Sequence, residues 1–181
     1  YRLACEQPGK FRGVASVSGS MTTETCAAGA STSVLHLHGL GDRHIPYLGG
    51  LSSPPKNASH MSHISDIYKG TQWPDTMSRL RDWERQLSCG EQTTESTNQD
   101  TICTVRQCDQ ETMVKSCVSL SAKHEWMGNK RSRPGVKNTK PKAGYLDATA
   151  QIWDFVRNLS GPKSTPTNNL ESDEVFLETS P

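Results

Sequence analysis

The chain has 181 residues, a formal net charge of +1 at pH 7, 33% hydrophobic residues and a mean hydropathy of −0.67. This length fits one domain with a modest core, and the nearly neutral charge argues against nucleic acid or a membrane surface as the partner. No segment contains the roughly 20 consecutive apolar residues that a transmembrane helix needs.

The first part of the chain predicts a helix followed by two strands. Residues 1–7 carry a helical apolar face that ends at Pro8. Residues 11–17 predict a strand of small residues. Residues 33–37 form an apolar run that only His36 interrupts, which favours a buried parallel strand over a half-exposed one.

The middle of the chain predicts a long loop and a second helix. Residues 51–73 are rich in Ser, Pro, His, Asn and Gly, and we expect at most one helical turn there, near residues 64–68. Asp75 fits the N-cap of a helix over residues 76–87, whose spacing places Trp83 in the core. We interpret the polar residues 91–109 as a connecting excursion.

The last part of the chain predicts a strand over residues 112–121 and a helix over residues 147–159. The basic segment 130–142 has no interleaved aromatic residues, so we interpret it as a solvated loop and not as a nucleic-acid site. Residues 1–160 are therefore expected to form an α/β domain, followed by a disordered tail over residues 161–181.

The cysteines favour disulfide bonds over a metal site. There are six, at Cys5, Cys26, Cys89, Cys103, Cys108 and Cys117, and none belongs to a zinc-type set. His60 and His63 also lack a third ligand nearby, so no metal is expected. Cys89 with Cys103 or Cys108 would close a loop between a helix and the next strand, and buried free thiols are the alternative.

Two Asn-x-Ser sequons, at Asn57 and Asn158, agree with an oxidising secretory route. Together with the cysteines, they lead us to expect an extracellular protein. The oligomeric state is left open.

Two polar residues follow predicted parallel strands. Asp42 comes after the strand over residues 33–37 and a Gly-Leu-Gly turn, and His124 comes after the strand over residues 112–121. The carboxyl ends of parallel strands meet at one edge of a sheet, where α/β proteins build their sites. An acid followed by a histidine is also the chain order that completes the Ser, Asp and His triad of α/β-hydrolases. In that triad the imidazole accepts the proton of the nucleophile, and the carboxylate orients the imidazole.

The motifs around these residues resemble one group of α/β-hydrolases, the polyhydroxybutyrate depolymerases and feruloyl esterases. Residues 36–50, His-Leu-His-Gly-Leu-Gly-Asp-Arg-His-Ile-Pro-Tyr-Leu-Gly-Gly, resemble the family segment His-x-His-Gly-Thr-x-Asp-x-x-Val-Pro-Tyr-x-Gly-Gly that bears the triad acid. Residues 124–128, His-Glu-Trp-Met-Gly, resemble the His-x-Trp-Pro-Gly around the triad base. Further segments resemble the family in the same order. These are residues 1–8, residues 14–19, Trp83 with the Cys89 and Cys108 pair, and residues 148–155.

The resemblance implies a partial α/β-hydrolase fold, consisting of its last mostly parallel strands with their flanking helices. It implies a secreted serine esterase in which Asp42 is the acid and His124 is the base, and Trp126 is predicted to contact the substrate. The substrate would be a small ester or a polyester, and no cofactor is implied.

The nucleophile is the missing component. The family carries its serine in Gly-x-Ser-x-Gly, shortly before the position of Tyr1, and the 181 residues contain no such motif. Ser18 and Ser20 are not expected to replace it, because they end a strand without the strained turn of a nucleophile elbow. We therefore expect this chain to be the acid and base half of an esterase and to be inactive in isolation. The alternative is a non-catalytic α/β-hydrolase-like domain that binds a ligand or partner.

Overall fold

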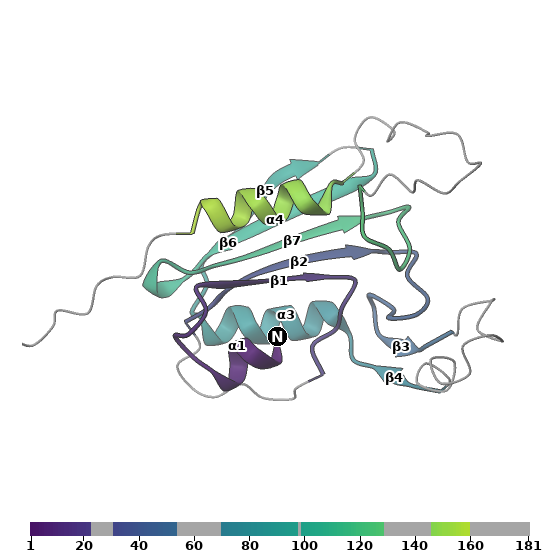
Figure 1. The fold of residues 1–181 in the computed structure, drawn as a ribbon, viewed down its shortest axis with the longest axis horizontal. Helices are drawn as coiled ribbons and strands as arrows, with labels where there is room; N and C mark the ends of the chain where they lie inside the picture. Colours follow the sequence, from purple (N-terminus) through teal and green to yellow (C-terminus); the bar gives the residue numbers. More distant parts are fainter. Residues whose placement is uncertain (23–30, 54–69, 98, 129–145, 160–181) are drawn as a thin grey trace, which may run out of the picture.

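The computed structural model describes residues 1–22, 31–53, 70–97, 99–128 and 146–159. These residues form a mixed α/β structure with a five-stranded sheet and three α-helices (Figure 1). The strand order across the sheet is β1 (Gly13–Val17), β2 (Ser33–Gly39), β7 (Met113–Ser119), β6 (Thr101–Gln107) and β5 (Gln92–Thr97). The pairs β1–β2 and β2–β7 are parallel, whereas β7–β6 and β6–β5 are antiparallel.

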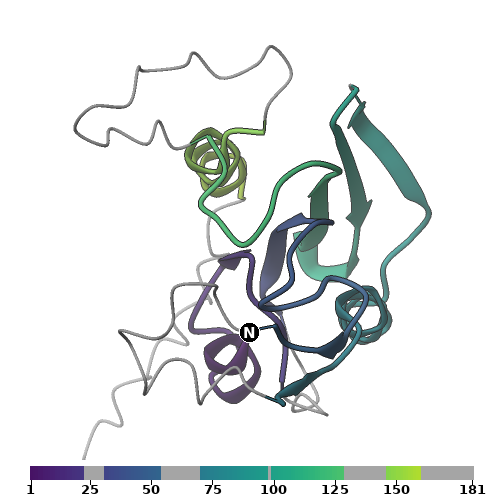
Figure 2. The same cartoon turned by 90° about the vertical axis from the view of Figure 1, so that its right-hand side faces the viewer.

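The helices cover both faces of this sheet. Figure 2 shows α4 (Ala148–Arg157) on one side, and α1 (Arg2–Glu6) and α3 (Thr76–Gln86) on the other. The predicted N-cap of α3 is confirmed, because the Asp75 carboxylate accepts a hydrogen bond from the backbone N–H of Met77 at 2.9 Å. Asp147 caps α4 in the same way through the N–H of Ala150 at 3.0 Å.

Strand β2 lies between β1 and β7 and separates two hydrophobic cores. All of its residues are buried, as the apolar run predicts for a parallel strand. Its side chains alternate between two cores. Val34 packs with Trp83 and other residues on the side of α1 and α3, and Leu35 and Leu37 pack on the side of α4. His36 and His38 share the face of Val34 and are fully buried.

The interpretation of residues 91–109 as an irregular connection is wrong. This segment contains β5 and β6, which extend the sheet in antiparallel order, and a 3-10 helix, η2 (Asp109–Glu111), begins at its end. The sheet is therefore mixed and only its β1–β2–β7 half is parallel. A second short pair, β3 (Gly50–Leu51) with β4 (Gln72–Trp73), joins the two ends of the predicted long loop over residues 51–73.

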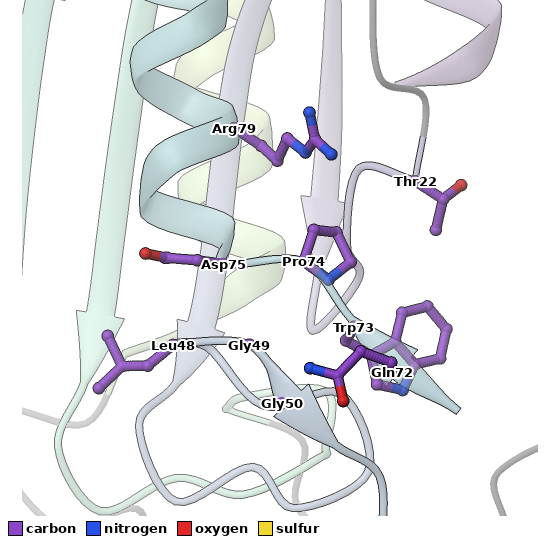
Figure 3. Close-up of a pocket in the computed structure, with 9 residues that line it drawn as sticks. All are labelled: Thr22, Leu48, Gly49, Gly50, Gln72, Trp73, Pro74, Asp75 and Arg79. Carbon is purple, nitrogen blue, oxygen red and sulfur yellow. The ribbon is translucent and has the colours of Figure 1, made fainter. Parts of the chain in front are cut away.

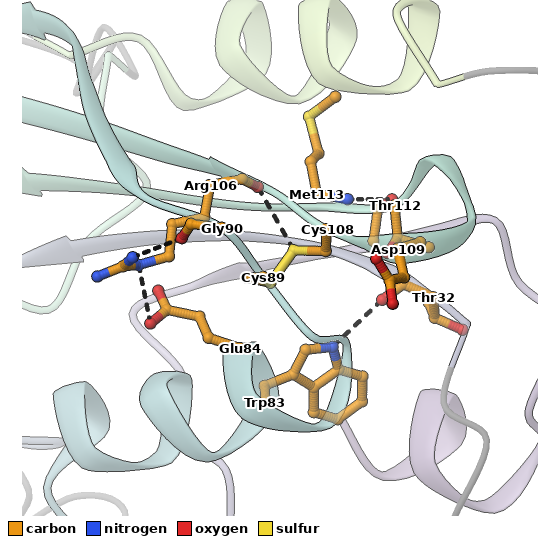
Figure 4. The surroundings of a disulfide bond; sticks show 11 residues. Thr32, Trp83, Glu84, Cys89, Gly90, Arg106, Cys108, Asp109, Thr112 and Met113 are labelled. Atoms are coloured by element: carbon orange, nitrogen blue, oxygen red, sulfur yellow. Dashed lines mark hydrogen bonds and ion pairs between the residues drawn. A yellow bond between two sulfur atoms is a disulfide. The ribbon is translucent and has the colours of Figure 1, made fainter.

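Two disulfide bonds join described residues. Cys89 pairs with Cys108, one of the two partners that the sequence leaves open, and Cys103 pairs with Cys117 across β6 and β7. No described cysteine is a free thiol. Figure 4 shows the Cys89–Cys108 bond beside Trp83, whose ring N–H donates to the carbonyl oxygen of Thr32 at 3.2 Å.

Several predicted features lie outside the described residues. These are Cys26, Asn57, His60, His63, the helical turn near residues 64–68, the basic segment 130–142 and the tail 161–181. Within the described part of the chain, no helix has the length and apolar character needed to cross a membrane.

Candidate active site

Asp42 is held rigidly in a tight turn after β2. Its Oδ1 atom accepts hydrogen bonds from the backbone N–H groups of His44 at 2.8 Å and Ile45 at 2.9 Å. An aspartate that binds the N–H groups two and three residues later stabilises such a turn. The residue is only 4% exposed, so the turn fixes a carboxylate inside the protein.

His124 lies next to this carboxylate. Its Nδ1 atom is 2.9 Å from Oδ2 of Asp42, and its side chain is 32% exposed, whereas the Asp42 side chain is fully buried. The predicted proximity of the two residues, which are 82 positions apart in the sequence, is confirmed. Since a carboxylate only accepts, Nδ1 carries the proton in this pair, and Nε2 is then the nitrogen that can accept a proton in the neutral ring.

Backbone contacts between the two strand ends create this proximity. In Figure 1 the arrows of β2 and β7 point the same way, so both following segments leave one edge of the sheet. The N–H of Leu40 donates to the carbonyl oxygen of Ser119 at 2.8 Å, and the N–H of Gly41 donates to that of Ala122 at 3.0 Å. The Asp42 turn and the His124 loop are thus one hydrogen-bonded unit.

The loop after β7 has a further anchor that the sequence analysis did not identify. Asp100, before β6, accepts hydrogen bonds from the Ser119 hydroxyl at 2.6 Å and from the N–H of Ser121 at 3.1 Å. At its far end, the carbonyl oxygen of Met127 accepts from the N–H of Ala148 at the start of α4. The His124 loop is therefore tied to β6 and α4 as well as to β2.

The electrostatic surroundings keep Asp42 ionised. Burial alone raises the pKa of a carboxyl group, but the hydrogen bonds from His124, His38 and the backbone of Ile45 outweigh it and hold the pKa of Asp42 well below its usual range. At neutral pH the carboxylate is therefore charged. A charged carboxylate can stabilise an imidazolium at His124.

A chain of buried side chains continues behind Asp42. The Nε2 atom of His38 is 2.9 Å from the carbonyl oxygen of Ile45 and 3.3 Å from Oδ2 of Asp42. The Nδ1 atom of His38 is 2.9 Å from Nε2 of His36, and the Tyr1 hydroxyl contacts Nδ1 of His36. Both histidines belong to the motif over residues 36–50, but the motif alone indicates no role for them. Because they are two positions apart on a predicted buried strand, the sequence could have indicated that both side chains lie on one face of the sheet.

Trp126 and Ser18 are two other residues that the sequence analysis considered for the site. The Trp126 indole is 49% exposed, and its N–H donates to the Thr149 hydroxyl at 3.1 Å, so its predicted substrate contact stays a prediction. Ser18 directly follows β1 and has a φ of 52°, a backbone conformation that is uncommon for a residue other than glycine. However, Ser18 is 4% exposed and its hydroxyl donates to the carbonyl oxygen of Glu125 at 3.3 Å, which does not present it as a nucleophile.

An open pocket of about 600 Å³ lies between the segment after Tyr47 and the start of α3. Figure 3 shows Trp73 and Gln72 of β4 and Arg79 of α3 among its lining side chains. Neither Asp42 nor His124 lines this pocket, and we do not assign it to the candidate active site. In the part of the chain that the structure describes, no group of three or more His, Cys, Asp or Glu side chains could hold a metal ion.

Comparison of the chain with models of known protein families gives no match, and comparison with curated proteins gives none either. The functional interpretation therefore depends on the geometry of Asp42 and His124.

Proposed function

We propose that this chain carries the acid and base of a secreted serine ester hydrolase with an α/β-hydrolase fold. The observation that carries the proposal is the hydrogen bond between the buried Asp42 carboxylate and Nδ1 of the partly exposed His124. The two residues follow adjacent parallel strands and occur in the order acid then histidine, which is the arrangement of the α/β-hydrolase triad.

In the proposed reaction, His124 acts as the general base. Nε2 accepts the proton of a serine hydroxyl as the oxygen attacks the ester carbonyl carbon, and His124 then returns this proton to the departing alcohol. Asp42 holds the imidazole in the Nδ1–H tautomer and stabilises the imidazolium while it is charged. The disulfides agree with secretion, and a small ester or polyester of the polyhydroxybutyrate or feruloyl type is the proposed substrate.

The serine must come from outside these 181 residues, because they contain no Gly-x-Ser-x-Gly motif. The same observation favours a second candidate, an α/β-hydrolase-like domain without catalysis. The coding sequence upstream of Tyr1 separates the two. An in-frame Gly-x-Ser-x-Gly segment supports the esterase, and a start codon directly before Tyr1 supports the binding domain.

The kinetic test uses the protein together with that upstream segment, with p-nitrophenyl butyrate and methyl ferulate as substrates. His124→Ala is expected to lower kcat by at least about 10³-fold, and Asp42→Asn by about 10⁴-fold, because triad members act as one unit. Ser18→Ala is the matched control and should keep kcat within about threefold of the unsubstituted protein. Hydrolysis that is insensitive to His124→Ala would refute the assignment.

A further inference from the structure

The imidazoles of His36 and His38 are fully buried, and the proposed reaction does not use them. Both project from β2 toward the side of α1 and α3, and together with Tyr1 they form a line of contacts that ends at the Asp42 carboxylate. Their neighbours determine where each ring carries its proton.

The assignment of protons begins at the Asp42 end. Nε2 of His38 faces two groups that only accept hydrogen bonds, the Ile45 carbonyl oxygen at 2.9 Å and Oδ2 of Asp42 at 3.3 Å. Nε2 of His38 must therefore carry a proton. In a neutral ring, Nδ1 of His38 is then an acceptor, and it lies 2.9 Å from Nε2 of His36.

The proton positions of His36 and Tyr1 follow from that of His38. Nε2 of His36 donates to His38, so Nδ1 of His36 is an acceptor, and the Tyr1 hydroxyl supplies its donor. Burial raises the pKa of Tyr1, which keeps this hydroxyl protonated. Burial, reinforced by the neighbouring His38, lowers the pKa of His36 from 6.5 to about 3. One arrangement of protons thus satisfies every ring nitrogen of the line.

This arrangement has a consequence for Asp42. An imidazole 3.3 Å from a buried carboxylate would ordinarily gain a proton and form an ion pair with it. His38 can become a cation only by a proton on Nδ1, and the Nε2–H of His36 occupies that nitrogen. If His38 were charged, the Asp42 carboxylate would be partly neutralised and would stabilise an imidazolium at His124 less well.

We propose that His36, supported by Tyr1, keeps His38 neutral and so reserves the charge of Asp42 for His124. His36 is in this sense a positioning residue that acts through His38. Its catalytic meaning depends on the proposed function, whereas the arrangement of protons can be tested in the 181-residue chain without any enzymatic activity.

Among the described residues, the other groups beside the two rings are consistent with this assignment. The Tyr47 ring centroid lies 6.3 Å from that of His36 and 5.4 Å from that of His38, and burial raises the pKa of Tyr47, so it stays neutral. On the neighbouring strands, Ser16 and Ser116 are in register with His36 and carry no charge. Lys115 of β7 is in register with Leu35, on the opposite face, where it forms an ion pair with Glu95.

The experiment records long-range proton–nitrogen spectra of the ¹⁵N-histidine-labelled 181-residue chain between about pH 4.5 and 8, a range that spans the ordinary titration of histidine. We expect His36 and His38 to be neutral with the proton on Nε2 throughout, and the neutral form of His124 to carry its proton on Nδ1. In His36→Phe, Nδ1 of His38 loses the donor that occupies it, so we expect His38 to carry a proton on Nδ1 as well as on Nε2, and the Nδ1–H signal of His124 to shift as Asp42 pairs with the new cation. In His36→Gln, the side-chain amide can still donate to His38, and the spectra of His38 and His124 should match those of the unsubstituted chain.

Two results would overturn the proposal. The first is a His38 ring in the unsubstituted chain that carries a proton on Nδ1, and the second is a folded His36→Phe variant in which the ring spectra of His38 and His124 are unchanged. If His36→Phe does not fold, the position of the His38 proton in the unsubstituted chain still tests the proposal. Absence of esterase activity in the longer protein would refute the proposed function and leave these spectra unaffected.

Discussion

A Cβ atom on Gly39 would lie 2.4 Å from the carbonyl oxygen of Ala122. Gly39 is the last residue of β2, and Ala122 lies two residues before His124, so this contact marks the place where the two halves of the candidate active site meet. Because the contact is with backbone, no side-chain rotation can relieve it. The hydrogen bond between Asp42 and His124 therefore depends on a glycine at this position.

Gly39→Ala is predicted to destabilise the protein and to separate Asp42 from His124. The added methyl group has to push the Ala122 backbone away, and we expect a loss of about 2 kcal/mol in the free energy of unfolding. Urea denaturation measures this loss, and the imidazole spectrum of His124 reports the altered contact. Gly90→Ala is the control, since its nearest contact would be an ordinary 3.6 Å from the carbonyl oxygen of Gln107. Equal stability of the two variants would contradict the prediction.

Asp42→Asn is predicted to destabilise the protein most at neutral pH. The folded-state pKa of Asp42 is lowered, so its stabilising contribution is complete above the unfolded-state value of about 4 and is lost as the pH falls through the folded-state pKa. The asparagine amide also places an NH₂ group opposite N–H groups that donate to the Asp42 carboxylate. We expect this change to lower the free energy of unfolding by about 2 kcal/mol at pH 7.

Urea denaturation of both proteins from pH 7 down to about pH 2 tests this dependence, and the difference in unfolding free energy should shrink below about pH 4. Asp154→Asn removes a surface carboxylate paired with Arg157 and serves as the control. Its effect should stay within about 0.5 kcal/mol at every pH. A difference between the Asp42→Asn and unsubstituted proteins that is constant with pH would count against the assigned ionisation of Asp42.

The features that the sequence predicts correctly depend on local residue patterns or on the positions where parallel strands end. The apolar run over residues 33–37 indicated β2, Asp75 indicated the start of α3, and the polar residues after two parallel strands indicated the pair of Asp42 and His124. These features follow from rules that act over a few residues or from the common direction of parallel strands.

The features that were missed depend on contacts between distant segments. Strand β5 consists of Gln, Thr, Glu and Ser and is an exposed edge strand. Strand β6 has apolar residues at positions 102, 103 and 105 among polar ones, so neither strand has the continuous or strictly alternating apolar pattern that marks a buried strand. Asp100 anchors the His124 loop only because the antiparallel pairing of β6 and β7 places it beside Ser119. The line from Tyr1 to Asp42 likewise appears only once α1 packs against β2.

His36→Gln is predicted to make the protein more resistant to acid. The folded-state pKa of His36 is about 3, below its ordinary 6.5, so between these values the unfolded chain binds one proton more than the folded protein at this residue. Stability therefore falls as the pH is lowered through this window, by up to about 1.4 kcal/mol per pH unit. Glutamine does not titrate and removes this contribution. Urea denaturation at pH values from 6.5 to 4 should give a shallower loss for the variant, and parallel curves would contradict the prediction.

Replacing both Cys89 and Cys108 by alanine is predicted to lower stability while leaving the candidate active site intact. This disulfide closes a loop with a sequence separation of 19, for which the entropy of the unfolded chain gives about 3 kcal/mol. Cys108 follows the end of β6 that pairs with Met113. The Asp42 segment follows Gly39 of β2 and the His124 segment follows Ser119 of β7, and both positions lie at the opposite end of the sheet. The Gly90 N–H still donates to the carbonyl oxygen of Gln107, and the Arg106 guanidinium still donates to the carbonyl oxygen of Gly90, so the end of α3 stays attached to β6. Figure 4 shows the contact between Arg106 and Gly90.

The measurements for this double variant are urea denaturation under non-reducing conditions and the imidazole spectrum of His124. We expect a lower midpoint and an unchanged spectrum, because the hydrogen bonds of Asp42 and His124 come from the other end of the sheet. Joint replacement of Cys103 and Cys117 is the comparison, since this bond crosslinks adjacent strands that their backbone pairing already holds together. A His124 spectrum altered by loss of the Cys89–Cys108 bond would show that the two ends of the sheet are coupled, contrary to the prediction.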